Sequence, residues 1–144
     1  MFYPGPRLQL YRSNKMPYID NLAMKSPKIL IIEDEKTLSR ALELKLTHAG
    51  FVTESAFNGE DGVKLIAKGP CSLILLDLIM PKMDGFGVLA VIKEKQIKTP
   101  VLVLTNLSQQ NDIKRAKEFG VKEFFIKSNT PIATIVDRVK EILK

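Results

Sequence analysis

From Lys28 to the end of the chain, short apolar runs alternate with amphipathic stretches. Runs typical of buried strands lie near residues 28–32, 51–55, 73–77, 101–104 and 122–126. After the first run, Leu38, Leu42 and Leu46 recur at helical spacing, and Gly50 marks the end of that helix. The same reasoning predicts further helices near residues 59–68, 86–95 and 108–119.

A last helix is predicted after residue 129. Thr130 has a side chain suited to an N-cap and Pro131 suits the first helical position, while Ile135, Val136 and Val139 fall on one face. Five strand–helix units with largely apolar strands are typical of a parallel sheet covered by helices on both sides. The pattern therefore predicts a doubly wound α/β domain over residues 27–144.

Residues 1–26 differ from the rest of the chain, because they show no sustained period of two or of 3.6 residues. Pro4, Pro6 and Pro17 would each interrupt a helix or strand in this segment. We therefore expect residues 1–26 to form a disordered N-terminal extension.

The composition limits the class of protein. A chain of 144 residues with 45% apolar residues is the size of one soluble globular domain. No apolar run reaches membrane-spanning length and no signal peptide is recognisable, so we expect a cytoplasmic protein without a membrane partner. Cys71 and His48 are the only cysteine and histidine, which excludes a Cys/His zinc site and leaves hard, oxygen-liganded metals.

The net charge of +6 raises the question of nucleic-acid binding. Half of this excess lies in residues 1–26, and the basic residues of the remaining chain are spread over several predicted helices. A nucleic-acid site would need them clustered on one face. We therefore expect no nucleic-acid partner.

Polar side chains follow four of the predicted strands. They are Glu33-Asp34-Glu35, Asp77, Thr105-Asn106 and Lys127-Ser128. In an open α/β sheet the functional crevice lies beyond the carboxyl ends of the strands, so these residues should converge. Carboxylates held close together repel one another unless they protonate or bind a cation, and their oxygens suit Mg²⁺. Such a site could take up a phosphoryl group, with Asp77 as a candidate nucleophile and with Lys127 and Thr105 contacting the phosphoryl oxygens.

These residues lead to a known family. The chain from residue 27 to residue 144 resembles the receiver domain of two-component response regulators, and the resemblance is carried by residues 29–35 (ILIIEDE), 75–85 (LLDLIMPKMDG), 101–105 (VLVLT) and 124–127 (FFIK). It implies a flavodoxin-like fold with five helices and a five-stranded parallel sheet in the order 2-1-3-4-5.

The resemblance also implies a role for each matched position. Asp77 is the phosphoacceptor; Mg²⁺ is held by Glu33 through water, by Asp34, by Asp77 and by the backbone carbonyl of Ile79; Thr105 and Lys127 bind the phosphoryl group; Thr105 and Phe124 form the switch. Phosphorylation would then remodel the face made by the helix near 108–119, the strand near 122–126 and the last helix.

The implied partners follow from these roles. The phosphoryl donor would be a sensor histidine kinase or a phosphotransfer protein, and the receiver would assist its own phosphorylation and dephosphorylation without being an enzyme of another substrate. The remodelled face would bind a downstream protein or a second copy of the chain. No residues follow Lys144 for a helix-turn-helix segment, so we expect a stand-alone receiver.

The chain departs from the family pattern around the site. Ser128 stands where the family usually has proline, and Phe124 has no hydroxyl group to hold an outward orientation. Ile79 and Leu107 are apolar at positions where polar residues could orient an attacking water, so we expect slow self-dephosphorylation.

Three other functions are compatible with parts of this pattern. A nucleotide-binding flavodoxin-like domain would need a phosphate loop after the first strand, where Glu33, Asp34 and Glu35 would repel phosphate. A haloacid-dehalogenase-type phosphatase would carry its nucleophile on the first strand, the reverse of the order here. A receiver-like adaptor that works without phosphorylation remains the alternative.

Overall fold

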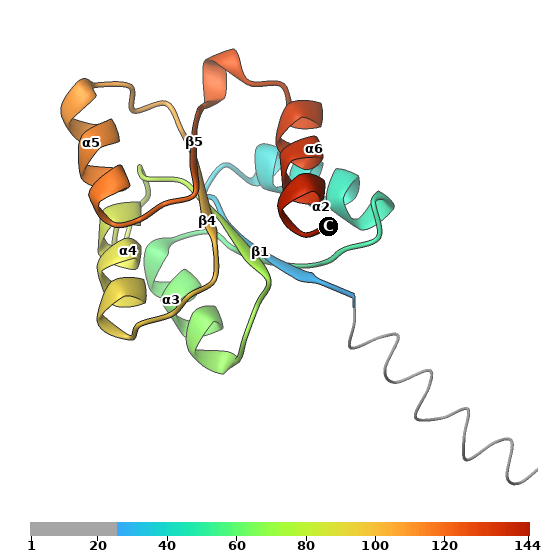
Figure 1. Cartoon of the computed structure of the whole chain (residues 1–144), viewed down its shortest axis with the longest axis horizontal. Helices are drawn as coiled ribbons and strands as arrows, with labels where there is room; N and C mark the ends of the chain where they lie inside the picture. Colours follow the sequence, from blue (N-terminus) through green and yellow to red (C-terminus); the bar gives the residue numbers. More distant parts are fainter. Residues whose placement is uncertain (1–25) are drawn as a thin grey trace, which may run out of the picture.

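A computed structural model describes residues 26–144 and has a five-stranded parallel sheet at its centre (Figure 1). The strand order is β2-β1-β3-β4-β5, as expected. The strands are β1 (Lys28–Ile32), β2 (Val52–Ala56), β3 (Leu73–Leu76), β4 (Val101–Thr105) and β5 (Glu123–Ile126). The predicted first strand is reproduced residue for residue, and the ends of the others differ by one residue.

Four α-helices connect the five strands, and one short 3-10 helix and a fifth α-helix follow β5. They are α2 (Lys36–His48), α3 (Gly59–Lys68), α4 (Gly85–Glu94), α5 (Gln110–Glu118), η1 (Lys127–Asn129) and α6 (Ile132–Ile142). The doubly wound, flavodoxin-like fold class is therefore confirmed. The expectation of disorder over residues 1–26 lies outside the described residues, apart from Ser26.

The sheet separates two apolar cores, because alternate strand residues point to opposite faces. Leu30, Ile74 and Val103 belong to the core beneath α3, α4 and α5, whereas Ile31, Leu75 and Leu102 belong to the core beneath α2 and α6. Figure 1 shows the same division, with α2 and α6 on one side of the sheet and the other three helices on the opposite side. Burial of both faces explains why the central strands are almost entirely apolar.

The last helix begins differently from the prediction. Thr130 is not its N-cap; its hydroxyl donates to the carbonyl of Ile126 at 2.8 Å and closes the turn that contains η1. Pro131 occupies the N-cap position with extended backbone, and the helix starts at Ile132. The prediction was wrong because the turn over η1 places the Ile126 carbonyl, four residues earlier, within reach of the threonine hydroxyl.

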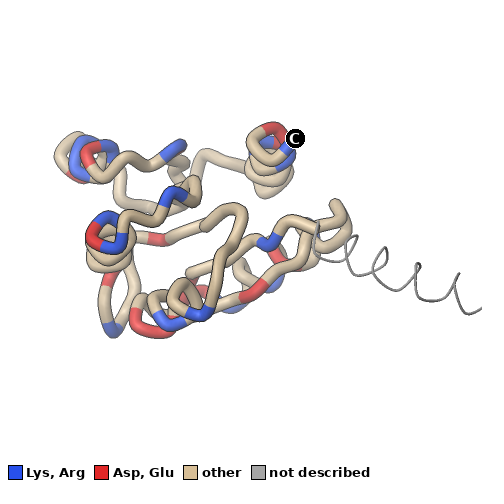
Figure 2. The backbone as a smooth tube through the Cα atoms, turned by 60° about the horizontal axis from the view of Figure 1, so that its bottom comes forward, with Lys and Arg blue, Asp and Glu red and all other residues tan. Residues whose placement is uncertain are grey.

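The charged residues are distributed as expected for a solvated surface. Figure 2 shows Lys and Arg positions interleaved with Asp and Glu positions on the helices of the described chain. In the same residues, no helix combines the length and the apolar character needed to cross a bilayer.

Candidate functional site

The ends of β1 and β3 bring the acidic side chains together. Ile32 lies opposite Leu76 in the parallel register, and the N–H of Asp77 donates to the carbonyl of Ile32 at 3.0 Å. Asp77 therefore leaves the sheet beside Glu33. The two side chains are almost completely buried, with residue exposures of 4% and 2% respectively.

Lys127 enters the same site from the end of β5. Its ammonium nitrogen lies 2.9 Å from Asp77 Oδ2, 2.9 and 3.0 Å from the two carboxylate oxygens of Glu33, and 3.0 Å from Glu35 Oε1. Only 11% of the Lys127 side chain is exposed. Three carboxylates thus share one ammonium group, although they lie 50 to 94 residues before this lysine in the sequence.

The carboxylates and the lysine alter one another's pKa values. Burial raises the pKa of Glu33 to about 7, although the Glu35 N–H and Lys127 favour its charged form. Burial would lower the pKa of Lys127, but its hydrogen bonds to Glu33, Asp77 and Glu35 outweigh that effect and raise it. Lys127 is therefore charged, and it provides the compensating charge for two buried acids.

Asp34 completes a possible metal-binding group. One carboxylate oxygen from each of Glu33, Asp34 and Asp77 lies within 4.8 Å of the others. Asp34 makes no hydrogen bond or ion pair with another described side chain, so both of its oxygens are open to a ligand. A pocket of about 210 Å³ opens here and is lined by Asp34, Glu35, Asp77, Ile79, Asn106 and Lys127. An all-oxygen donor set beside open space suits Mg²⁺.

The loop after β3 holds Asp77 in place. The N–H of Ile79 donates to Asp77 Oδ1 at 3.2 Å, and the N–H of Gly85 donates to the carbonyl of Leu78 at 3.0 Å. A Cβ atom on Gly85 would lie 2.3 Å from the backbone oxygen of Asp77, so α4 begins closer to the strand end than a side chain would permit. Asp84 accepts from the N–H of Gly87 at 2.9 Å and thereby caps α4.

The same loop also docks on α3. Lys82 and Met83 have left-handed backbone, with φ of 51° and 91°, and the Lys82 carbonyl accepts from the N–H of Glu60 at 3.0 Å. Gly59 has no room for a side chain because a Cβ atom there would lie 2.1 Å from the Met83 carbonyl oxygen. This contact could not be predicted from the sequence, because two non-glycine residues in left-handed conformation leave no local signal.

Thr105 and Phe124 lie outside the lining of the acidic pocket. Thr105 is fully buried, and its Oγ1 accepts from the N–H of Leu107 at 3.4 Å. Phe124 pairs with Val103 across the β4–β5 register and packs, half-buried, against the core beneath α3, α4 and α5. The structure therefore does not bring these two residues into the pocket lining with Asp77, Asp34 and Lys127.

The positions that depart from the family pattern also have defined places. Ile79 is 52% exposed and lines the pocket, whereas Leu107 packs against the core and is not in the pocket lining. The Lys127–Ser128 peptide is trans. Glu35, which the sequence analysis gave no individual role, proves to be the third partner of Lys127.

Comparisons with known proteins agree with this geometry. A family model described as "Response regulator receiver domain" matches residues 29–140. The chain is 34% identical over 100 residues to the transcriptional regulatory protein DltR of Streptococcus agalactiae, covering 69% of this chain and 45% of the relative. It is 32% identical over 117 residues to the response regulator ArlR of Staphylococcus aureus, covering 81% of this chain and 52% of the relative.

Among solved structures, the receiver domain of a Francisella response regulator superposes with a TM-score of 0.77 at 26% identity, covering 82% of this chain and 97% of that one. The chain spans about half the length of the curated relatives it matches. Both relatives are named as regulators, and DltR is named as a transcriptional one. These names do not support the expectation that the chain has no nucleic-acid partner.

Proposed function

Because this chain belongs to the response regulator receiver domain family, we propose that it accepts a phosphoryl group on Asp77 and thereby changes the surface it offers to a partner. The observation that carries the proposal is the position of Asp77. It is a buried carboxylate 2.9 Å from the Lys127 ammonium, and one of its oxygens lies within 4.8 Å of oxygens from Glu33 and Asp34. A carboxylate nucleophile needs this combination of charge neutralisation and positioning.

The proposed transfer uses a phosphohistidine of a sensor kinase or phosphotransfer protein as donor. An Asp77 carboxylate oxygen forms a bond to phosphorus, and the phosphorus–nitrogen bond to the donor imidazole breaks. The imidazole leaves with its electron pair and takes up a proton. Mg²⁺, held by Glu33 through water, Asp34, Asp77 and the Ile79 carbonyl, would supply positive charge to the phosphoryl oxygens.

Lys127 has to change partners during this reaction. In the described state its ammonium group contacts Glu33, Glu35 and Asp77. A phosphoryl group on Asp77 adds roughly −1.5 to −2 charge at this point, and it attracts the ammonium more strongly than the exposed Glu35 does. Lys127 would therefore release Glu35 first and bind a phosphoryl oxygen.

The proposed switch begins at Thr105. Its oxygen accepts from Leu107, so the hydroxyl hydrogen remains available to donate to a phosphoryl oxygen. Movement of Thr105 would vacate space beneath β5, and the half-buried ring of Phe124 could then turn inward and bury more of its surface. The change would reach the face formed by α5, β5 and α6, where a downstream protein or a second copy would bind. If the output is transcriptional, as the name of DltR suggests for that relative, it would depend on the protein that binds this face.

Phosphorylation by acetyl phosphate tests the proposal against the adaptor alternative. With Mg²⁺, intact-mass measurement should show one phosphoryl addition to the full chain, and chelation of the metal should prevent it. Asp77→Asn should abolish the addition, whereas Asp137→Asn, on the exposed surface of α6, should leave it unchanged. If the wild-type protein gains no mass, the phosphorylation-independent adaptor is the better description.

The lifetime of the phosphoryl group should be long. Ile79 lines the pocket with an apolar, 52% exposed side chain that offers an attacking water no hydrogen bond. Ile79→Asn adds an amide beside Asp77 and should speed dephosphorylation roughly tenfold by orienting that water. The measurement is loss of the phosphorylated mass with time, and Ile79→Leu, which keeps the apolar character, should leave the rate unchanged. A half-life of seconds in the wild-type protein would contradict this account.

A further inference from the structure

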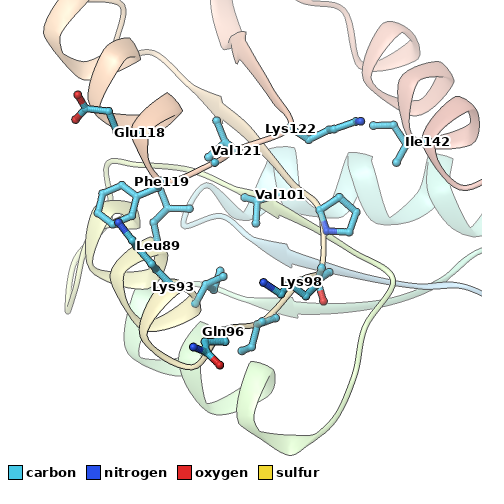
Figure 3. A pocket seen from close by; sticks show the side chains of 15 residues that line it. Leu89, Lys93, Gln96, Lys98, Val101, Glu118, Phe119, Val121, Lys122 and Ile142 are labelled. Atoms are coloured by element: carbon cyan, nitrogen blue, oxygen red, sulfur yellow. The ribbon is translucent and has the colours of Figure 1, made fainter.

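A second cavity lies at the opposite edge of the sheet from Asp77. Its volume is about 620 Å³, within the range of about 300–1,000 Å³ that is common for small-molecule sites. Its lining comes from α4 and the connection that follows it, from the first residue of β4, from the end of α5 and its connection to β5, and from Ile142 of α6. Figure 3 shows side chains from these four segments around one hollow. None of them belongs to the acidic pocket.

The cavity combines an apolar wall with a basic rim. Leu89, Ile92 and Val101 are buried in the core and present apolar surface to it. Lys93, Lys98 and Lys122 are exposed on the lining, and Glu118 is its single acidic residue.

These lysines are not neutralised by the described part of the chain. None of the three has a carboxylate within 4.0 Å there, whereas Lys28, Lys68 and Lys127 do form ion pairs. Lys93 instead lies 5.8 Å from the centre of the Phe119 ring, in a cation–π arrangement that leaves its charge uncancelled (Figure 3). The cavity therefore offers an anionic group three ammonium groups that no described carboxylate neutralises, beside an apolar surface.

Gln96, on the rim of the cavity, occupies an unfavourable backbone conformation. Helices α2 and α5 are each followed by a glycine with left-handed backbone, Gly50 at φ 99° and Gly120 at φ 83°. The end of α4 has the same pair of hydrogen bonds as the end of α2, with Gln96 N–H donating to the Lys93 carbonyl and Ile97 N–H donating to the Ile92 carbonyl, but Gln96 has φ 56°. Gln96 therefore occupies a backbone position that favours glycine, and its side chain lines the cavity.

We propose that this cavity is a binding site for a small organic anion with an apolar body. The apolar body would contact Leu89, Ile92 and Val101. The acidic group would lie at the rim, where Lys98 and Lys122 add positive charge from two sides and the Gln96 amide would donate a hydrogen bond. This site is independent of the phosphoryl site, because the two share no residue.

The probe is 8-anilinonaphthalene-1-sulfonate, which joins an aromatic body to one sulfonate and fluoresces when it leaves water. We expect saturable binding of one molecule per chain, with amide shifts in NMR spectra confined to residues 89–101, 118–122 and the end of α6. The double variant Lys98→Gln/Lys122→Gln should weaken binding at least tenfold. The neutral analogue N-phenyl-1-naphthylamine should bind more weakly than the sulfonate and be insensitive to that double variant.

Three controls separate binding from folding and from phosphorylation. Lys45→Gln/Lys64→Gln removes two exposed lysines of α2 and α3 and should leave binding unchanged. Gln96→Gly should raise the thermal midpoint, because it removes the left-handed side chain, and yet weaken binding of the sulfonate. Asp77→Asn should abolish phosphorylation without affecting the titration.

Two results would overturn the proposal. One is unchanged affinity for the sulfonate in the folded Lys98→Gln/Lys122→Gln variant, and the other is a set of shifted amides outside the cavity. If an acidic peptide shifts the cavity amides while the sulfonate does not, the site serves a protein partner and the small-molecule assignment is wrong.

Discussion

Lys127→Met is expected to lower the free energy of unfolding by about 3 kcal/mol in the absence of Mg²⁺, because it leaves two buried carboxylates without their cation. Glu33 and Asp77 are nearly inaccessible to water, and Lys127 contacts both at 2.9 Å. Methionine reproduces the four-atom stem of the lysine side chain without its ammonium group, so the loss reports mainly the charge. Urea denaturation with the metal chelated would measure the effect.

Added Mg²⁺ should reduce this destabilisation. The metal would replace the missing positive charge, so the difference in unfolding free energy between Lys127→Met and the wild-type protein should shrink as Mg²⁺ approaches saturation. Calorimetric titration should also show tighter Mg²⁺ binding to the variant, since the ammonium group no longer repels the metal.

The matched control for Lys127 is its exposed partner. The Glu35 side chain is 61% exposed, so Glu35→Gln removes an ion pair screened by water and should change the unfolding free energy by less than about 1 kcal/mol. If Lys127→Met proves no more destabilising than Glu35→Gln, the ammonium group is not what balances the buried acids.

Gly85→Ala should have an effect of similar size for a steric reason. The added Cβ would lie 2.3 Å from the Asp77 carbonyl oxygen and 2.7 Å from Leu78 Cα, and both are backbone atoms that cannot move without displacing the end of β3. We expect a loss of about 3 kcal/mol of unfolding free energy. Slower phosphorylation by acetyl phosphate should accompany it, because the shifted backbone carries Asp77.

Gly69→Ala provides the comparison. No heavy atom lies within 4 Å of a Cβ atom at Gly69, which is at the C-cap of α3. Its φ of 161° is extended backbone that alanine adopts freely. This variant should be neutral or stabilised by about 0.5 kcal/mol, since alanine restricts the unfolded chain. Equal losses for the two variants would show that close packing at Gly85 does not hold the phosphoacceptor in place.

Much of the architecture could be read from the chain because it rests on local patterns. The apolar run at residues 28–32 and the amphipathic stretch at residues 59–68 fall on β1 and α3 without error. Helix starts are less predictable where a neighbouring backbone carbonyl competes for a side chain. Thr130 has the chemistry of an N-cap, but the carbonyl of Ile126 takes its hydroxyl.

The acidic cluster was foreseeable for a topological reason. Residues that follow parallel strands meet at one edge of the sheet, so Glu33, Asp34, Asp77 and Lys127 could be grouped before any distance was known. Their partners could not be assigned in the same way. That Lys127 also binds Glu35, and that Thr105 and Phe124 lie outside the lining of the acidic pocket, depends on side-chain packing between separate elements.

The sequence by itself determined the alternation of strands and helices and the edge at which the acids gather, because hydrophobic period and chain order are local properties. Only the tertiary structure decided which carboxylates share the Lys127 ammonium, why residue 85 must lack a side chain, and that three lysines surround a second cavity. Each of these depends on contacts between segments far apart in the chain, and the periodicity of one segment does not predict such contacts.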